Sequence, residues 1–326
     1  MKTRVAVVGA GFMGRTHATS YGKAGLEAEV LYIVDSDPIR AESLAASLSP
    51  RAKGLSEIQT ALDDLAIDAV DICLPTRFHH ELCIRSLKAG KHVLCEKPIA
   101  SNIEEARGML EAGSNSGKTF MVAHVLRFWP EYVRAGEIIG EGGIGKLRRI
   151  SCARLSAPPE WSAGNWLLDS KMSGGAVRDL AIHDYDFMNQ LAGMPQKVCA
   201  CGDLMDFTAL FRFADGAVGS VHASYALPPG FPFRMSFLIL GDKGSLEFDG
   251  TGGSLSLVRN GEQETLSVSG SRTFRQNESA SDPDGYFYEI AHFVDCVRNG
   301  RSPEQGRPED ARDALAIALS VEAALA

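Results

Sequence analysis

The chain has 326 residues, and at roughly 150 residues per domain this length favours two domains. Hydrophobic residues make up 45% of the chain and charged residues 23%, which is typical of a globular protein and excludes a disordered or fibrous one. The formal net charge of −8, with no block of basic residues, argues against nucleic acid and anionic membranes as partners.

The cysteines and the first residues bear on the cellular compartment. Seven cysteines, an odd number, lie scattered along the chain, which favours reduced thiols over a secreted disulfide framework. The apolar run after Met1 lacks a cleavage region, so we expect no signal peptide. No stretch reaches the roughly 18 apolar residues that a membrane span needs. We therefore expect a cytoplasmic protein without a membrane segment.

Strand and helix signals alternate over the first 125 residues. In chain order, strands are expected at 4–8, 29–34, 68–74, 92–95 and 119–125, and helices at 12–24, 38–48, 79–89 and 101–116. This alternation predicts an α/β domain with a parallel sheet and helices on both of its faces.

After about residue 125 extended runs joined by turns become more frequent. Helices are expected at 130–139, 175–191, 286–298 and 308–325, strands at 146–156, 197–204, 207–213, 218–225 and 235–240, and a loop at 269–285. The dipeptides Asp215-Gly216 and Asn260-Gly261 suit hairpin turns, because both central residues need positive φ. We expect a Rossmann domain at 1–124 and an α+β domain with a large, mostly antiparallel open sheet at 125–326, whose last helix is free to pack back on the first domain.

A glycine turn follows the first strand and opens the first helix. Gly9 permits a tight turn, Gly11 leaves room for a pyrophosphate at the helix N-terminus, and Gly14 allows close helix–strand packing. Asp35 ends the second strand, 21 residues after Gly14, where an acid binds the ribose hydroxyls. We expect cofactor contacts from Gly9, Gly11, Phe12, Met13, Gly14 and Asp35.

Asp35 also bears on the choice of cofactor. A carboxylate near the adenosine ribose accepts hydrogen bonds from the 2′-hydroxyl and repels a 2′-phosphate, which favours NAD over NADP. Arg40 is the only nearby cation that argues the other way. No metal is expected to take part.

Lys97 follows the fourth strand, at the edge of the sheet where open α/β folds bind ligands. Pro98 biases Lys97 toward an extended backbone, so its side chain is able to point into a cleft. The alternative is a surface lysine in a loop.

Several motifs lie along the chain in order. They are the glycine turn, LPTRFH at 74–79, AGKHVLCEKP at 89–98, Gly174-Gly175 followed by Asp179 and His183, and finally Tyr286, Glu289 and Phe293. Together they resemble the Gfo/Idh/MocA family of oxidoreductases over nearly the whole chain. The resemblance implies a Rossmann domain joined to a domain with a large open sheet, through which dimers or tetramers form. It also implies hydride transfer between a nicotinamide cofactor and a sugar, inositol or related polyol.

The resemblance extends to single residues. It implies cofactor contacts from Leu74, Pro75, Thr76, His79, Glu96 and Lys97, and substrate contacts from Lys97, Arg127, Asp179, His183 and Tyr286. His79 has the alternative of packing at a helix start, and Arg127 that of an ion pair between domains. Two departures stand out: relatives often carry Thr-Pro-Asn where this chain has Leu74-Pro75-Thr76, and Trp-Arg where it has Trp166-Leu167. Asn165 and Trp166, in a polar stretch, are expected to line the substrate pocket.

Asp179 and His183 are four residues apart, so in a continuous helix they share one face. On spacing alone an ordinary solvated pair is favoured, and the family pattern reverses this preference. Oxidation of an alcohol removes the hydroxyl proton as hydride leaves the carbon, and histidine suits this because its pKa lies near neutrality. We expect His183 to be the general acid/base, Asp179 to orient it and contact substrate, and Lys97 to position the hydroxyl.

The sequence thus predicts an NAD(H)-dependent oxidoreductase that acts on a polyol or sugar. One alternative is an NAD-dependent glycosidase or lyase that oxidises a ring carbon transiently, so that NADH does not accumulate. Another is a cofactor-binding sensor without turnover, which the presence of Lys97 and His183 disfavours. The substrate itself is not predicted.

Overall fold

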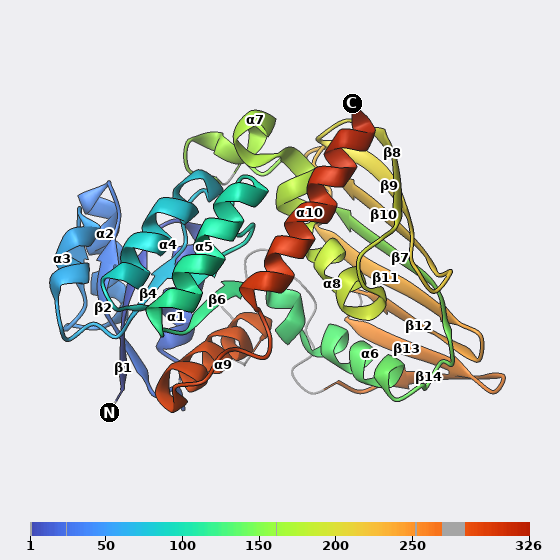
Figure 1. Ribbon diagram of the computed structural model, residues 1–326, viewed down its shortest axis with the longest axis horizontal. Helices are drawn as coiled ribbons and strands as arrows, with labels where there is room; N and C mark the ends of the chain where they lie inside the picture. Colours follow the sequence, from blue (N-terminus) through green and yellow to red (C-terminus); the bar gives the residue numbers. More distant parts are fainter. Residues whose placement is uncertain (1, 24, 161, 252, 269–283) are drawn as a thin grey trace. The chain divides into compact units, whose positions relative to one another are not determined.

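The computed structural model describes residues 2–23, 25–160, 162–251, 253–268 and 284–326 (Figure 1). The chain divides into two compact units. Unit 1 comprises Met1–His124, Trp161–Ala163 and Tyr286–Arg312, and unit 2 comprises Val125–Glu160, Gly164–Gly285 and Asp313–Ala326. Most of the loop predicted at 269–285 lies outside the described residues. Among the helices that the structure describes, none is long and apolar enough to span a membrane.

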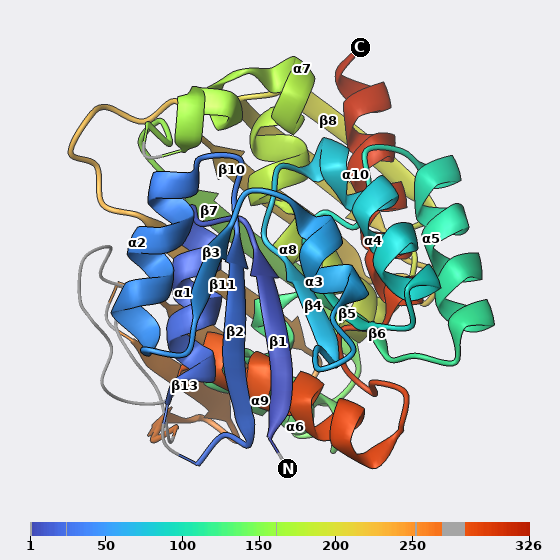
Figure 2. The ribbon, with the colours of Figure 1, turned by 90° about the vertical axis from the view of Figure 1, so that its left-hand side faces the viewer.

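Unit 1 contains a six-stranded parallel sheet in the order β3-β2-β1-β4-β5-β6. Its strands are β1 (Thr3–Val8), β2 (Ala28–Val34), β3 (Lys53–Leu55), β4 (Ala69–Ile72), β5 (His92–Glu96) and β6 (Phe120–Ala123). This is the strand order of a dinucleotide-binding Rossmann fold, and Figure 2 shows β1, β2 and β4 side by side. The α/β class predicted from the alternating pattern is therefore confirmed.

Helices connect these parallel strands, as a crossover between parallel neighbours requires. They are α1 (Phe12–Tyr21), α2 (Pro38–Leu48), α3 (Ile58–Asp63), α4 (His79–Lys88) and α5 (Ile103–Ser116). Most of α9 (Gly285–Asn299), from the C-terminal part of the chain, also belongs to unit 1. Asp37 caps α2 by accepting hydrogen bonds from the backbone N–H groups of Ile39 and Arg40. Helix α1 has no such side-chain cap and no acid in its first turn. Its positive end is therefore not offset by a side chain of that first turn.

Unit 2 contains an eight-stranded sheet in the order β14-β13-β12-β11-β7-β10-β9-β8. Its strands are β7 (Leu147–Leu155), β8 (Lys197–Gly202), β9 (Asp206–Arg212), β10 (Val218–Ser224), β11 (Arg234–Gly241), β12 (Gly244–Asp249), β13 (Ser254–Arg259) and β14 (Glu262–Leu266). Only β7 and β10 pair in parallel, so the predicted mostly antiparallel sheet is confirmed. Asn260 and Gly261 both have positive φ in the β13–β14 turn, as a hairpin of this type requires.

An aromatic cluster joins helices to one face of this sheet. The helices of unit 2 are α6 (Pro130–Gly140), α7 (Ser170–Ser173) and α8 (Ile182–Ala192), while α10 (Pro308–Leu325) runs from unit 1 into unit 2. Tyr132 of α6 packs edge-on against Phe187 of α8 and Phe237 of β11, with ring centroids 4.7 and 5.0 Å apart. Buried and exposed residues alternate along β9, so the opposite face of the sheet is the exposed one.

The structure differs from the sequence prediction in several places. Strand β3 and helices α3 and α7 were not predicted, and neither were β12, β13 and β14. The helix predicted at 175–191 is broken: Ala176–Leu180 forms a π-helical turn, and α8 begins at Ile182.

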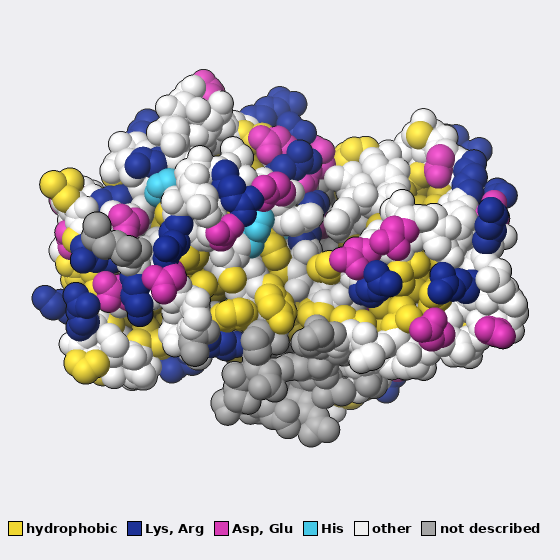
Figure 3. Space-filling model, turned by 90° about the horizontal axis from the view of Figure 1, so that it is seen from below, with side chains coloured by type: hydrophobic (Ala, Val, Ile, Leu, Met, Phe, Trp, Pro, Cys, Tyr) yellow, Lys and Arg dark blue, Asp and Glu magenta, His cyan; other side chains and the backbone are white. Residues whose placement is uncertain are grey.

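The surface charge is mixed on the face that Figure 3 draws. Acidic and basic side chains are interspersed there, without one large region of a single sign. This distribution is unlike the basic stripe that accompanies nucleic-acid binding.

Candidate active site

The glycine turn of unit 1 is shaped by close backbone contacts. Gly9 has a φ of +106°, and a Cβ at this position would lie 2.3 Å from the carbonyl oxygen of Cys73. A Cβ at Gly14 would lie 1.7 Å from the carbonyl oxygen of Gly9. A Cβ at Gly11 would meet nothing nearer than Arg40, at 4.0 Å. Two glycines thus allow the turn to close, while Gly11 keeps the N-terminus of α1 open to a ligand.

This open N-terminus fits a pyrophosphate group. Helix α1 presents its positive end without a side-chain cap, which is the arrangement that binds phosphates in Rossmann folds. Phe12 is about half exposed and Met13 is half-buried, and both belong to the first turn of α1.

Asp35 is buried at the end of β2 and accepts three hydrogen bonds. Its Oδ2 accepts from the N–H of Ala10 at 2.8 Å and from Nη2 of Arg40 at 3.2 Å, and its Oδ1 accepts from the N–H of Asp37 at 2.9 Å. A carboxylate has about four acceptor positions, so one remains for a ribose hydroxyl. Arg40 offsets part of the charge with which Asp35 would repel a 2′-phosphate.

The segment that follows β4 is tied to the segment that follows β5. His79 is fully buried, with Nδ1 2.8 Å from the carbonyl oxygen of Pro98 and Nε2 2.7 Å from that of Leu74. Both ring nitrogens therefore face backbone carbonyls of the protein. Leu74 and Pro75 are half-buried, and Thr76 is buried.

Lys97 is half-buried, and the Lys97–Pro98 peptide bond is cis. Its backbone N–H donates a hydrogen bond of 3.0 Å to Oε2 of Glu96. The Glu96 carboxylate is itself buried, with Oε1 3.2 Å from Nε2 of His17. Burial raises the pKa of Glu96, but His17 outweighs this effect and lowers it below its ordinary value.

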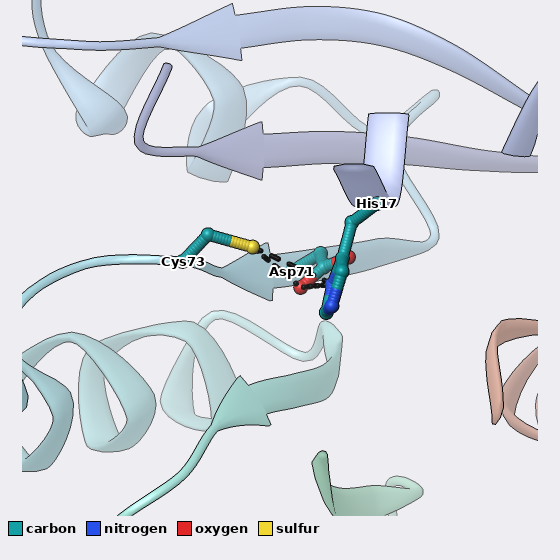
Figure 4. A group of neighbouring side chains, drawn as sticks. All are labelled: His17, Asp71 and Cys73. Carbon is teal, nitrogen blue, oxygen red and sulfur yellow. Dashed lines mark hydrogen bonds and ion pairs between the residues drawn. The ribbon is translucent and has the colours of Figure 1, made fainter. Parts of the chain in front are cut away.

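His17 of α1 lies at the centre of a buried polar cluster (Figure 4). Its Nδ1 lies 3.0 Å from Oδ2 of Asp71 and 3.5 Å from Sγ of Cys73, and its Nε2 also lies 3.9 Å from Oε2 of Glu289. Burial opposes protonation of the ring, but Cys73 and Asp71 raise the pKa of His17 well above its ordinary value. The ring thus lies among carboxylates that favour its protonated form.

In unit 2, Asp179 lies in the π-helical turn and His183 in the first turn of α8. Asp179 is buried, and its Oδ2 accepts a hydrogen bond of 2.5 Å from the hydroxyl of Tyr225. His183 is half-buried, with its Nδ1 shielded from solvent. The expectation of one continuous helix carrying both side chains was wrong, because the π-helical turn and Ala181 separate the two segments.

The other two acids near His183 are held by arginines of the same unit. Asp186 forms a bidentate pair with Arg127, at 2.7 Å from Nε and 2.8 Å from Nη2. Asp184 forms a bidentate pair with Arg154, at 2.9 Å for both contacts. All four side chains are buried. Arg127 thus pairs within unit 2, which differs from the alternative of an ion pair between domains.

The remaining predicted substrate residues lie in separate places. Asn165 is exposed and has a φ of +54°, and Trp166 beside it is half-buried. Tyr286 is half-buried in α9, with its ring centroid 6.4 Å from that of His17.

Neither His17 nor Tyr225 is among the candidate site residues predicted from the sequence. Each contacts a predicted site residue through tertiary structure, and no motif or spacing marks those contacts.

Two family models match the chain. One, described as "Oxidoreductase family, NAD-binding Rossmann fold", matches residues 3–124, and the other, "GFO/IDH/MocA C-terminal domain", matches residues 132–247. The chain is 30% identical over 319 residues to the scyllo-inositol 2-dehydrogenase (NAD(+)) of Bacillus subtilis, which covers 93% of this chain and 88% of that protein. It is 30% identical over 261 residues to the inositol 2-dehydrogenase of Rhizobium meliloti, which covers 76% of this chain and 75% of that protein.

Solved structures share the fold over the full length. A levoglucosan dehydrogenase in complex with NADH and levoglucosan superposes with a TM-score of 0.85 at 24% identity, covering 99% of this chain and 97% of that one. A UDP-N-acetylglucosamine 3-dehydrogenase from Acidithiobacillus ferrooxidans superposes with a TM-score of 0.83 at 24% identity, covering 100% of this chain and 98% of that one. Together with the matches of the two family models, the glycine turn and the strand order of unit 1 establish that the chain belongs to the Gfo/Idh/MocA family of NAD-binding oxidoreductases.

Proposed function

We propose that this protein is a dehydrogenase that transfers hydride between NAD(H) and a hydroxyl-bearing carbon of an inositol, a sugar or a related polyol. The observation that carries the proposal is the match over 93% of the chain to an NAD(+)-dependent inositol dehydrogenase. The residue types that alcohol oxidation needs are also present: Lys97, Asp179 and His183 are all at least half-buried. The relatives named above are dehydrogenases, which does not favour the glycosidase or lyase alternative.

The residues of the chain supply placement and proton transfer. NAD, when bound, supplies the hydride acceptor. Gly11 and the N-terminus of α1 would hold its pyrophosphate, and Asp35 its adenosine ribose. Lys97 donates a hydrogen bond to the substrate oxygen and stabilises the negative charge that develops there.

His183 removes the hydroxyl proton in this mechanism. Its Nδ1 is shielded from solvent while the residue is half-buried, so we propose that Nε2 is the atom that accepts the hydroxyl proton. Asp179 favours the imidazolium that forms and contacts the substrate. Arg127, Asn165, Trp166 and Tyr286 complete the proposed substrate contacts.

The test is a screen of inositols, hexoses, anhydrosugars and sugar acids with NAD, read by NADH absorbance. We expect NADH to accumulate with at least one polyol, and turnover of His183→Ala to fall about a hundredfold or more. A loss below about tenfold would refute the role of His183. Cleavage of a glycoside without accumulation of NADH would replace a dehydrogenase with a glycosidase.

We further propose a homodimer or homotetramer that forms through the exposed face of the unit 2 sheet. Leu210 pairs with Ser220, Ser220 with Ser151, and Ser151 with Leu238, so both leucines lie in one row on one face. Leu210 is 56% exposed and Leu238 is 38% exposed. Such apolar side chains on an open sheet suit a self-complementary interface. Light scattering should give the mass of an oligomer, and Leu210→Glu should lower that mass.

We also propose a cytoplasmic location, because the cysteines are scattered and odd in number, as is typical of reduced thiols.

A further inference from the structure

The segment Glu96–Lys97–Pro98 lies between two fully buried histidines of unit 1. One of them, His17, contacts the side chain of Glu96, the residue before Lys97. The other, His79, contacts the carbonyl oxygen of Pro98, the residue after it. The roles expected for Glu96 and His79 were cofactor contacts, and neither role explains why these groups point into the protein interior.

On the first side, Glu96 is held at both of its carboxylate oxygens. Oε1 lies 3.2 Å from Nε2 of His17, and Oε2 accepts the backbone N–H of Lys97 at 3.0 Å. His17 is itself fixed from the opposite side of its ring by Asp71, at 3.0 Å. An unbroken chain of contacts therefore runs from β4 through the ring of His17 to the backbone nitrogen of Lys97.

On the second side, His79 bridges two backbone carbonyls. Pro98 and Leu74 both offer oxygen acceptors, at 2.8 and 2.7 Å, so a hydrogen atom is needed on each ring nitrogen for both contacts to be hydrogen bonds. Burial outweighs the two carbonyls and Glu96 and lowers the pKa of His79 below its ordinary value, so the geometry gives two close contacts of which a neutral ring makes one a hydrogen bond. His79 thus ties the residue after Lys97 to the end of β4.

This anchoring matters because a lysine side chain has four flexible carbons and loses conformational entropy when it is fixed. A displacement of about 1 Å in a catalytic group can cost a hundredfold in rate. We propose that His17 and His79 are positioning residues, which clamp the backbone on both sides of Lys97 and so aim its amine at the substrate oxygen. The inference rests on the proposed dehydrogenase function.

The test uses His17→Gln, His79→Gln and Glu96→Gln, each made in the natural protein and again together with Lys97→Met. We expect each change alone to lower kcat about tenfold or more, and to lower it less than about twofold once the Lys97 amine is absent. The matched control is His92→Gln, at the other end of the same strand β5. His92 accepts the N–H of Thr119 at 2.9 Å, and its substitution should lower stability while kcat stays within about twofold.

A second measurement does not depend on turnover. Acylation of Lys97 by an N-hydroxysuccinimide ester, followed by peptide mass spectrometry, reports how freely its amine moves. We expect faster labelling in the three variants than in the natural protein and in His92→Gln, both with and without NADH. This measurement remains decisive if no polyol is oxidised, in which case the proposed function fails by itself.

Three results would overturn the inference. The first is an equal loss of kcat in the presence and absence of the Lys97 amine, which would mean a general structural effect. The second is unchanged labelling of Lys97 in all three variants. The third is a stoichiometric metal ion in the purified protein that His17→Gln releases, because His17, Asp71 and Cys73 would then be its ligands.

Discussion

Tyr225 provides the sharpest test of the site in unit 2. Replacing it with phenylalanine removes one hydroxyl, which donates a 2.5 Å hydrogen bond to Asp179, and leaves the ring in place. Burial and the nearby Asp179 raise the pKa of Tyr225 well above its ordinary value, so the hydroxyl stays a donor at every pH of interest. Hydrogen bonds to charged groups contribute about 1.5–3 kcal/mol, and a buried acceptor that loses its donor keeps its desolvation cost.

We therefore expect Tyr225→Phe to lower the free energy of unfolding by about 2 kcal/mol, or roughly thirtyfold in the folding equilibrium constant. Urea denaturation of both proteins measures this difference. The matched control is Tyr185→Phe on α8. Its side chain is equally buried, and its hydroxyl has no hydrogen-bond partner in the described part of the chain. That substitution should change stability by less than about 0.5 kcal/mol.

Turnover separates a positioning role from a purely structural one. In the proposed mechanism Asp179 assists His183, and Tyr225 orients the Asp179 carboxylate, so kcat should fall in Tyr225→Phe and stay unchanged in Tyr185→Phe. Equal destabilisation of the two variants would refute the importance of this hydrogen bond. A destabilised Tyr225→Phe protein with unchanged kcat would refute its link to catalysis.

Two further predictions concern unit 1. Asp35→Ser should raise the ratio of kcat/KM for NADP to kcat/KM for NAD by about tenfold or more. The reason is that Arg40 would remain without the carboxylate with which it now pairs. An unchanged ratio would contradict the role of Asp35. Burial lowers the pKa of His92 to about 4, below the value of about 6.5 in the unfolded chain, so the folded state loses stability as pH falls from about 6.5 to about 4. Denaturation curves of His92→Gln over this range should show a smaller loss than those of the natural protein, and equal losses would contradict this reasoning.

The cofactor half of the site was predictable because its residues lie at positions that the fold dictates. Gly9 and Asp35 each end a strand of a parallel sheet, and strand alternation alone brings those ends to one edge. Strand β3 was missed because it has three residues, one of them glycine, and pairs only with β2. Strands this short are set by their neighbours rather than by their own composition.

The clamp around Lys97 shows a different limit of sequence reasoning. Glu96, Lys97 and Pro98 form a recognisable motif, yet His17 lies 79 residues before Glu96 and belongs to a helix with a different apparent role. Buried polar groups are satisfied by whatever the tertiary structure brings near them, so their partners have no fixed spacing in the sequence.

The acids around His183 differ in their tertiary contacts, which the sequence does not show. Asp179, Asp184 and Asp186 all lie within four residues of the histidine, and composition does not distinguish them. The structure does, because Arg154 and Arg127 take Asp184 and Asp186 in bidentate pairs that fix α8 within unit 2. Asp179 instead receives a hydrogen bond from the hydroxyl of Tyr225, which orients its carboxylate. In the proposed mechanism Asp179 is therefore the acid that assists His183, since a carboxylate favours an imidazolium that forms near it.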